Sequence, residues 1–576
     1  MNDRPLLVEP VAVLTELTTY TTGRPGDGID LVLDFNERLA PPDALADAAG
    51  FDAWHINRYP ELGALEPLIA ERLGVPEASV LVTGGADDAL ERTVRSVCVP
   101  GSNAIMTTPS YGMIRRFIRI AGAELVEIPW WRDDFPIEAV LERADDTTAL
   151  VCVVSPNNPT GSVASRDAFR RLLEALPRTL VLLDQAYVDF TDPEYDLAPL
   201  ALDYPNAVVV RTFSKAWGAA GLRVGYALGD PRVVDWLRRI GLPFPVSAPS
   251  LALAATMLAD GDGPGSRRIA AIRQQRDELS GVLVELGAEV LPSQGSFVFA
   301  RFADAGRVWS SLHALGIAIR AFHGRPDVEG WLRITLPGDE VTFARLTHAL
   351  CTVLGPQALI FDMDGVLADV SGSYREATRR TAAAFGVELE IQDIEAATAE
   401  GNANDCWQLT RRLMAARGVN RPLAEVKMRF EEIYQGTETE PGLRRTERLL
   451  MEPAELRALG QRLPLAVVTG RPRADAERFL TEHDIAGCFQ TVVTMEDAPI
   501  KPNPAPVRLA LERLGVSTAW MIGDTPDDLR AARCAAVLPI GVIAPGDDPE
   551  ATTASLHRAG AAAVLSDIRK ILEVLP

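Results

Sequence analysis

Short apolar runs alternate with amphipathic stretches along most of the chain. Runs such as 80–83, 150–154 and 180–184 contain mainly aliphatic side chains, which is typical of buried strands. Segments such as 87–98 and 166–175 follow polar turns and repeat their apolar positions at helical spacing. This alternation predicts an α/β protein with parallel sheets, helices on both sheet faces and ligands at the carboxyl ends of the strands.

A second series of strand-like runs begins after residues 354–356, where a helical stretch ends at a glycine and a proline. The segment 371–449 contains almost no strand-like run and many helix formers, so it is predicted to be a helical insertion. We therefore expect a first part over 1–355 and a second part over 356–576, with the insertion inside the second part.

Composition narrows the class of protein further. The 576 residues include 57 Lys and Arg against 79 Asp and Glu, a net charge of −22, and the paired arginines are scattered. Such a chain lacks the basic face of a nucleic-acid binder. No apolar run approaches the roughly 18 residues of a membrane span, the N-terminus has no signal layout, and the six cysteines lie far apart. We expect a cytoplasmic protein that binds neither nucleic acid nor membrane.

Lysine is rare, with arginine in most basic positions. The four lysines are Lys215, Lys427, Lys501 and Lys570. Arginine can replace lysine wherever only surface charge matters, but it cannot form a Schiff base and is a poor substitute for a compact ammonium. Lys215, the only lysine of the first part, directly follows a strand-like run, and Lys501 opens the motif KPNP. Both are therefore candidates for chemistry.

Polar motifs follow several other strands of the first part. GGADD (84–88) opens a helix, SPNNPTG (155–161) follows a buried run, and Asp184 ends another. Pyridoxal phosphate needs a lysine amine, a carboxylate for its pyridine nitrogen and an anion cradle, preferably at a helix N-terminus. These groups, in this order, predict a pyridoxal phosphate site.

Residues 1–355 resemble the fold-type-I aminotransferases, most closely the histidinol-phosphate aminotransferase family. The matching stretches are NRYPELGALEPLIAERLG (57–74), GGADDAL, TPSYGMI (108–114), SPNNPTG, DQAY, RTFSKAWGAAGLRVGY (211–226) and WLRIT (331–335). The resemblance implies a large parallel-sheet domain over about 46–244. It implies a small domain over about 1–45 and 245–355, and a homodimer.

By this resemblance Lys215 forms the Schiff base and shuttles the proton, and Asp184 binds the pyridine nitrogen. The other cofactor contacts implied are Asn157 and Tyr187 at the ring oxygen, Tyr111 on the ring, and Ala86, Asp87, Thr212, Ser214 and Arg223 at the phosphate, with Tyr59 reaching the cofactor phosphate of the partner subunit. The implied contacts to a substrate phosphate are Arg333, Arg320 and Tyr20.

The sequence departs from the family pattern at three places, and two of them leave the substrate open. Gln185 stands where the family usually has Glu, beside the ring aspartate. NERL (36–39) replaces Asn-Glu-Asn-Pro, and GSF (295–297) replaces a loop that usually has Asn before Phe. The last two lie in substrate-facing segments.

Two aspartates begin a second candidate site in ALIFDMDGVLAD (358–369). Asp362 and Asp364 follow a buried strand, and side chains two residues apart in an extended chain point to the same side. Neighbouring carboxylates repel unless a cation joins them, and oxygen ligands suit Mg²⁺. GDTPDD (523–528), with Asp524 and Asp528, follows another strand, and Thr469 ends a third in VVTGR.

These motifs resemble the haloacid dehalogenase superfamily of phosphatases, with the insertion 371–449 at the place of its helical type-1 cap. The implied catalytic core is about 356–370 and 450–576. The resemblance implies that Asp362 attacks phosphorus and that Asp364 protonates the leaving alkoxide and later activates water. Thr469 and Lys501 would bind the phosphoryl oxygens. Mg²⁺ would be held by Asp362, Asp364 and Asp524, with support from Asp528.

The combination predicts a bifunctional enzyme. A phosphorylated substrate would receive an amino group from glutamate or a similar donor, and a phosphate monoester would then be hydrolysed, as in a route to histidinol. Three alternatives remain: the same chemistries on a phosphorylated sugar, ketone or aldehyde; decarboxylation of a phosphorylated amino acid; and a non-catalytic binding protein with one relic domain. The segment GNANDCW (401–407) is a candidate substrate-facing loop of the cap, and a plain connecting loop is the alternative interpretation.

Overall fold

The computed structural model describes residues 28–34, 36, 59–60, 65–259, 265–401 and 404–576. Tyr20 and most of NERL lie outside the described residues. The chain forms two compact units. The first is built mainly from Val32–Ala305 and Ala318–Ala344, and the second from Gly28–Leu31, Gly306–Ile317 and Arg345–Pro576. Among the helices that the structure describes, none has the length and apolar character needed to cross a membrane.

The first unit contains a seven-stranded sheet in the order β2-β8-β7-β6-β5-β3-β4. Its strands are β2 (Val80–Thr83), β3 (Asn103–Thr108), β4 (Glu124–Pro129), β5 (Thr148–Val154), β6 (Leu180–Asp184), β7 (Ala207–Thr212) and β8 (Gly225–Gly229). The sequence predicted a parallel sheet, but the observed sheet is mixed, because β8 runs antiparallel to both β2 and β7. Loop 213–224 joins β7 to β8 without a crossover helix, so the chain returns alongside β7 in the opposite direction.

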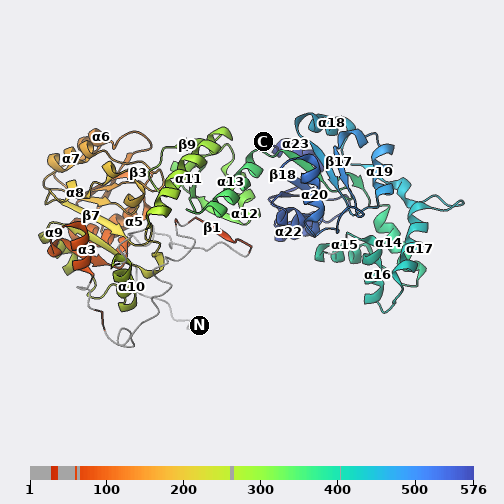
Figure 1. Ribbon diagram of the computed structural model, residues 1–576, viewed down its shortest axis with the longest axis horizontal. Helices are drawn as coiled ribbons and strands as arrows, with labels where there is room; N and C mark the ends of the chain where they lie inside the picture. The colour runs from red at the N-terminus through yellow and green to blue at the C-terminus, as the bar shows by residue number, and fades with distance from the viewer. Residues whose placement is uncertain (1–27, 35, 37–58, 61–64, 260–264, 402–403) are drawn as a thin grey trace. The chain divides into compact units, whose positions relative to one another are not determined.

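Helices cover both faces of this sheet (Figure 1). They are α3 (Glu66–Leu73), α4 (Ala86–Val97), α5 (Gly112–Ile120), α6 (Ile137–Arg143), α7 (Arg166–Ala175), α8 (Ala198–Ala201), α9 (Pro231–Ile240) and α10 (Ala248–Ala259). Successive strand residues join different cores: Val181 and Leu183 pack in one hydrophobic cluster and Leu182 in the other. A strand buried on both faces needs such a continuous apolar run, which explains the pattern seen in the sequence.

A five-stranded sheet has the order β1-β11-β12-β10-β9. Its strands are β1 (Leu31–Leu33), β9 (Glu289–Leu291), β10 (Phe297–Arg301), β11 (Ile317–Ala321) and β12 (Trp331–Thr335), and the helices of this region are α11 (Ser266–Glu285), α12 (Ala305–Ala314) and α13 (Glu340–Leu354). Strand β12 runs antiparallel to β10 and β11 and carries Arg333.

The second unit is built on a parallel six-stranded sheet in the order β17-β16-β13-β18-β19-β20. Its strands are β13 (Ala358–Phe361), β16 (Leu465–Val468), β17 (Thr491–Val493), β18 (Ala519–Gly523), β19 (Leu538–Val542) and β20 (Ala563–Leu565). Its helices are α18 (Pro453–Arg462), α19 (Arg473–Glu482), α20 (Ala505–Leu514), α21 (Pro526–Cys534), α22 (Pro549–Arg558) and α23 (Ile571–Val574). The chain runs from β13 to β16 and β17 on one side and then returns to form β18, β19 and β20 on the other side of β13. The carboxyl ends of β13 and β18 therefore lie at a topological switch point, where such sheets bind ligands.

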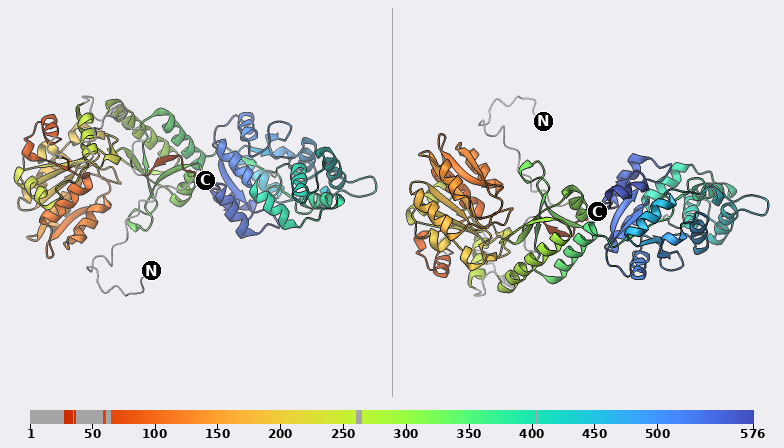
Figure 2. Two further views of the ribbon diagram at one scale, coloured as in Figure 1. Left: turned by 90° about the horizontal axis from the view of Figure 1, so that it is seen from below. Right: turned by 90° about the horizontal axis from the view of Figure 1, so that it is seen from above.

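The predicted helical insertion over 371–449 is helical in the structure. Its helices are α14 (Tyr374–Ala384), α15 (Ile391–Glu400), α16 (Cys406–Ala416) and α17 (Leu423–Gln435). They gather in one group beside the six-stranded sheet (Figures 1 and 2). The short antiparallel strands β14 (Ala368–Asp369) and β15 (Arg448–Leu449) pair where the chain enters and leaves this cap.

Candidate active sites

The first candidate site lies at the carboxyl ends of the strands of the seven-stranded sheet. Asp184 ends β6, and Lys215 stands three residues after the neighbouring strand β7. The ammonium of Lys215 is 5.7 Å from the ring centroid of Tyr187, and its charge acts on the Asp184 carboxyl. The structure therefore brings together the lysine, the carboxylate and an aromatic side chain expected around a pyridoxal ring.

Asp184 is a buried carboxyl group suited to a cationic ring nitrogen. Burial raises the pKa of Asp184 to about 7, although the backbone N–H of Ala186, which donates to its Oδ1 at 3.0 Å, works in the opposite direction. The charge of Asp87 raises this pKa further, and that of Lys215 lowers it. A protonated pyridine nitrogen beside Asp184 would favour the ionised carboxylate, so the residue fits the pyridoxal ring.

An anion-binding cradle adjoins this carboxyl at the N-terminus of α4. A Cβ on Gly225 would lie 2.6 Å from the carbonyl carbon of Gly85, so β8 approaches the start of the helix this closely only with glycine. The Thr212 hydroxyl donates to Ser214 Oγ at 3.0 Å, and a guanidinium nitrogen of Arg223 lies 3.5 Å from the same oxygen. Helix N–H groups, two hydroxyls and a guanidinium suit a phosphate group.

The remaining predicted ring contacts are engaged with protein groups. The Tyr111 hydroxyl donates to Asp87 at 2.8 Å. The Asn157 amide donates to Pro109 O and Thr160 Oγ, both at 2.8 Å, so its predicted contact with the ring oxygen stays a prediction.

Tyr187 has a partner that sequence reasoning missed. Its hydroxyl accepts from the Asn36 amide at 2.8 Å, and Thr335 donates to the Asn36 carbonyl oxygen. Asn36 is the first residue of NERL, so the sequence marked the segment as substrate-facing without indicating this contact.

Two arginines lie side by side in the five-stranded sheet. Arg320 of β11 is directly opposite Arg333 of β12, and cross-strand neighbours share one sheet face. Arg333 is buried, and it donates to Asn158 Oδ1 and to the backbone oxygen of Asp34, each at 2.6 Å. Like charges directly opposite repel, so an anionic ligand between them would be stabilising.

Gln185 has a structural partner at the position where the family carries glutamate. The buried Gln185 carbonyl oxygen accepts from Arg211 at 3.1 Å, and Arg211 also pairs with Asp196 at 2.6 Å. A neutral amide therefore satisfies the guanidinium without adding a second carboxylate next to Asp184.

The second candidate site gathers around Lys501. Its ammonium lies 2.7 Å from Asp362 Oδ1 and 2.6 Å from Asp528 Oδ1, and it donates to Val468 O at 3.1 Å. Asp362, Asp524 and Thr469 follow the adjacent strands β13, β18 and β16, which explains why motifs far apart in sequence meet at one sheet edge.

The carboxylates of this site could hold a divalent cation. Asp362, Asp524 and Asp528 each offer an oxygen, and these oxygens lie within 4.8 Å of one another. Asp524 Oδ1 is buried without a hydrogen-bond partner among the described residues. Burial raises the pKa of Asp362 to about 7, and burial together with the neighbouring carboxylates raises the pKa of Asp524 well above its usual range. Such a donor set fits Mg²⁺, whose charge would keep both groups ionised.

The cap contributes to the space above these carboxylates. A cavity of about 90 Å³ is lined by core residues that include Asp362, Asp364 and Asp524, and by cap residues that include Asn404 and Cys406. Asn404 and Cys406 of the cap thus contribute to the wall of the candidate site, and the interpretation of their segment as a substrate-facing loop stays a prediction. The Asn404 amide also donates to Asp527 of the core at 3.2 Å.

Comparison with known proteins decides the family. The family model described as aminotransferase class I and II matches residues 32–350, and that of haloacid dehalogenase-like hydrolases matches residues 356–536. The chain belongs to the class I and II aminotransferases. A haloacid dehalogenase-like hydrolase domain follows in the same chain, so both predicted enzyme classes are confirmed.

Individual relatives agree with this assignment of the aminotransferase part. A histidinol-phosphate aminotransferase of Aeromonas hydrophila is 35% identical over 335 residues, which are 56% of this chain and 92% of the relative. One of Pectobacterium carotovorum is 34% identical, covering 59% of this chain and 96% of the relative. The structure of a histidinol-phosphate aminotransferase from Sinorhizobium meliloti in complex with pyridoxal-5'-phosphate matches with a TM-score of 0.53 and 26% identity, covering 60% of this chain and 98% of that one.

Removing the buried ammonium of the hydrolase domain should destabilise this aminotransferase-hydrolase chain. In Lys501→Met, the carboxylates of Asp362 and Asp528 lose their shared cation, and breaking a buried pair costs about 3–5 kcal/mol. We expect a lower melting temperature of the hydrolase unit, partly restored by Mg²⁺, and loss of phosphate release. The melting temperature is measured by calorimetry for Lys501→Met and for the control Lys570→Met, which changes an exposed lysine. Equal melting temperatures for the two variants would contradict the role given to this cation.

Proposed function

We propose that this chain is a bifunctional enzyme that transfers an amino group on a histidinol-phosphate-like substrate and hydrolyses a phosphate monoester in a consecutive step. One observation carries the proposal. A single chain combines a lysine near a buried carboxyl and a facing pair of arginines in its first part with three carboxylates gathered around a buried lysine in its hydrolase domain. A phosphate kept through the first reaction is what the second reaction would remove.

The first site supports pyridoxal phosphate as cofactor. Bound there, the cofactor supplies an electron-accepting ring that stabilises a substrate carbanion. Asp184 would bind the ring nitrogen, the start of α4 with Thr212, Ser214 and Arg223 would hold the phosphate, and the Lys215 amine would move the proton at the substrate carbon. Arg320 and Arg333 would grip the substrate phosphate through charge-assisted hydrogen bonds. The remaining residue roles implied by the resemblance belong to the same proposal.

The second site supports hydrolysis of the phosphate ester. An Asp362 oxygen would attack phosphorus, and Asp364 would give its proton to the leaving oxygen and later accept one from water. Lys501 and the Thr469 hydroxyl would bind the phosphoryl oxygens. Mg²⁺, held by Asp362, the Asp364 backbone and Asp524 with support from Asp528, supplies positive charge for the transfer.

A second copy of this chain is the proposed partner of the aminotransferase part. Tyr59 has 80% of its surface exposed and stacks on the exposed ring of Phe244, with a centroid distance of 4.6 Å. Trp236 and Leu242 are exposed as well. Apolar side chains exposed in this way suit a subunit interface, where Tyr59 could reach the cofactor phosphate of the partner subunit.

The substrate of the first step is tested with a chain whose phosphatase is silent. The Asp362→Asn variant, loaded with pyridoxal phosphate, is mixed with histidinol phosphate in the absence of any keto acid. We expect the visible absorbance of the cofactor to change to that of its amine form, because the amino group moves to the cofactor and no acceptor returns it. Histidinol without phosphate is the matched control, since it cannot engage the pair Arg320 and Arg333.

Other outcomes distinguish the alternatives. An unchanged spectrum would remove histidinol phosphate as substrate and move the search to phosphorylated sugars, ketones or aldehydes, each tested by amino transfer from glutamate. Release of CO₂ from a phosphorylated amino acid, without amino transfer to 2-oxoglutarate, would identify a decarboxylase. A chain with neither cofactor colour nor phosphate release would be a binding protein.

A further inference from the structure

Arg471 is a buried guanidinium three residues beyond strand β16, and its side chain is 1% exposed. A buried charge is stable only when it is paired. Its Nε and Nη2 contact Asp364 Oδ1 at 2.6 and 2.5 Å, and its Nη1 donates to Glu447 Oε2 at 2.9 Å. One guanidinium therefore joins the proposed acid–base residue of the core to a glutamate at the end of the cap.

The position of this guanidinium is determined by several elements. Its carbon lies 5.0 Å from the ring centroid of Tyr374 in α14 and 5.3 Å from that of Phe479 in α19. The backbone N–H of Arg471 donates to the Thr469 hydroxyl at 3.1 Å, which ties the loop to the proposed phosphoryl-binding residue. Arg471 is thus held in place before any substrate binds.

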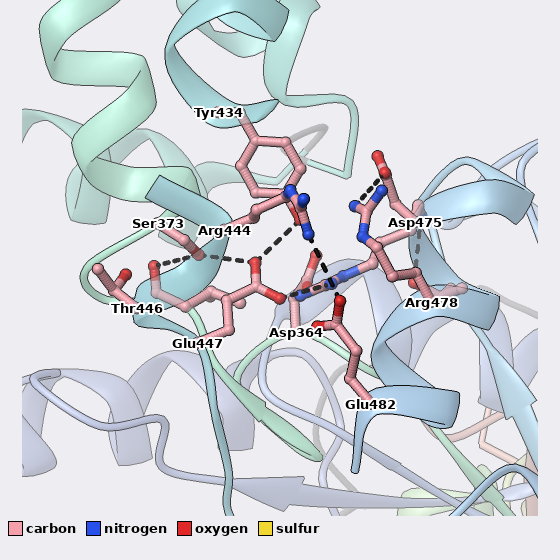
Figure 3. Close-up of polar contacts among 12 residues, drawn as sticks. Asp364, Ser373, Tyr434, Arg444, Thr446, Glu447, Asp475, Arg478 and Glu482 are labelled. Carbon is pink, nitrogen blue, oxygen red and sulfur yellow. Dashed lines mark hydrogen bonds and ion pairs between the residues drawn. The ribbon is translucent and has the colours of Figure 1, made fainter. Parts of the chain in front are cut away.

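Glu447 links the same guanidinium to the cap helices. Figure 3 shows Glu447 beside Ser373 and Tyr434 of the cap. The side chain of Glu447 is only 5% exposed, and the residue directly precedes strand β15. Its Oε1 accepts from Ser373, which precedes α14, at 2.9 Å and from Tyr434, near the end of α17, at 3.0 Å. A shift of the cap relative to the core would therefore change the contacts of Glu447 with Arg471.

We propose that Arg471 is a positioning residue that orients Asp364 toward the leaving group, and that Glu447 makes this orientation depend on the cap. The proposal rests on the phosphatase function proposed above. Both guanidinium contacts go to Oδ1, and in the described part of the chain no hydrogen bond reaches Oδ2. Oδ2 is therefore the oxygen available to the substrate.

The step that this orientation serves can be written out. An Asp362 oxygen forms a bond to phosphorus, the ester P–O bond breaks with its electron pair going to the leaving oxygen, and the proton of the Asp364 carboxyl passes to that oxygen. In the second step a water oxygen bonds to phosphorus, its proton returns to Asp364, and the bond between phosphorus and Asp362 breaks. Misplacing Asp364 slows the first step most when the leaving oxygen is a poor leaving group.

Leaving-group dependence separates positioning from a merely structural role. We would measure kcat and KM of the full chain with Mg²⁺ for p-nitrophenyl phosphate, whose phenolate departs without a proton, and for phenyl phosphate, whose phenolate needs one. For Arg471→Lys we expect kcat for p-nitrophenyl phosphate divided by kcat for phenyl phosphate to rise about tenfold, because a positioned acid contributes factors of 10² or more. KM should stay unchanged for both esters. Arg478→Lys is the matched control, because Arg478 pairs with Asp475 at 2.5 Å in the same region and does not contact Asp364.

Two results would overturn the proposal: an equal fall of kcat for both esters, or a change confined to KM. If circular dichroism shows that Arg471→Lys does not fold, the same two esters are measured with Glu447→Gln instead. The amide keeps the shape of the side chain and removes only its charge. We expect a smaller rise of the same ratio for this variant, and an unchanged ratio would overturn the link to the cap. A wild-type chain that hydrolyses neither ester would instead refute the phosphatase function itself.

Discussion

Replacing Lys215 with alanine is expected to abolish amino transfer and to leave phosphate release unchanged. Lys215 is the only lysine in the first 355 residues, and it lies beside Tyr187 and acts electrostatically on Asp184. No neighbouring arginine can replace its amine, because a guanidinium does not give up a proton near neutral pH. A positioned proton-transfer group contributes about 10²- to 10⁴-fold, so we expect the amino-transfer rate to fall toward the upper end of that range, by about 10⁴-fold.

Amino transfer is measured in a single turnover with histidinol phosphate, monitored by the cofactor absorbance. Release of inorganic phosphate is measured with the same preparation. Lys215→Arg is the matched control for charge: it keeps a cation near Asp184 but lacks the amine, so it should be equally inactive. An active arginine variant would show that Lys215 acts only through its charge. Retained turnover in the alanine variant would refute its assignment as the proton-transfer residue.

The second large effect is expected at Asp362. The Asp362→Asn side chain keeps the size of the carboxylate and its place beside Lys501, but it loses the anionic oxygen that attacks phosphorus. We expect phosphate release to fall by at least about 10⁴-fold, as for the loss of a nucleophile in other covalent enzymes. Amino transfer should be unaffected, because its residues belong to a different sheet.

Stability provides a further test of the same variant. Burial raises the pKa of Asp362, which means that the surrounding protein disfavours the charged carboxylate. Lys501 keeps its ion pair with Asp528 in this variant, so the buried ammonium is not left unpaired. A neutral amide should therefore leave the melting temperature unchanged or raise it in the absence of Mg²⁺. Asp484→Asn, at a side chain that is 94% exposed, is the control for loss of one negative charge. A strongly lowered melting temperature for Asp362→Asn alone would assign Asp362 a structural role and leave its loss of activity uninterpreted.

Much of the fold followed from local patterns. Apolar runs predicted the strands β2 and β6 with their observed bounds, and the helix formers of 371–449 predicted a helical cap. The exception is β8, whose antiparallel direction depends on how loop 213–224 returns, and apolar periodicity carries no information on strand direction.

For the candidate sites, too, the sequence marked some residues and missed others. Asp184, Lys215, Asp362 and Asp524 stand at or just beyond strand ends, so a short stretch of sequence around each was sufficient to mark it. The contact of Asn36 with Tyr187 joins residues 151 positions apart, and the contact of Arg471 with Asp364 joins residues 107 positions apart. No local pattern marks such partners, because the need of a buried polar group for a partner arises only when distant segments pack together.

The sequence by itself determined the α/β class, the two enzyme families and the residue types at each candidate site, since strand ends and their motifs are local properties of the chain. Only the tertiary structure decided that Arg320 faces Arg333 across two strands, that Lys501 joins Asp362 to Asp528, and that Glu447 connects the cap to Arg471. These pairings depend on register, burial and charge, which arise when the strands assemble and water is excluded between them.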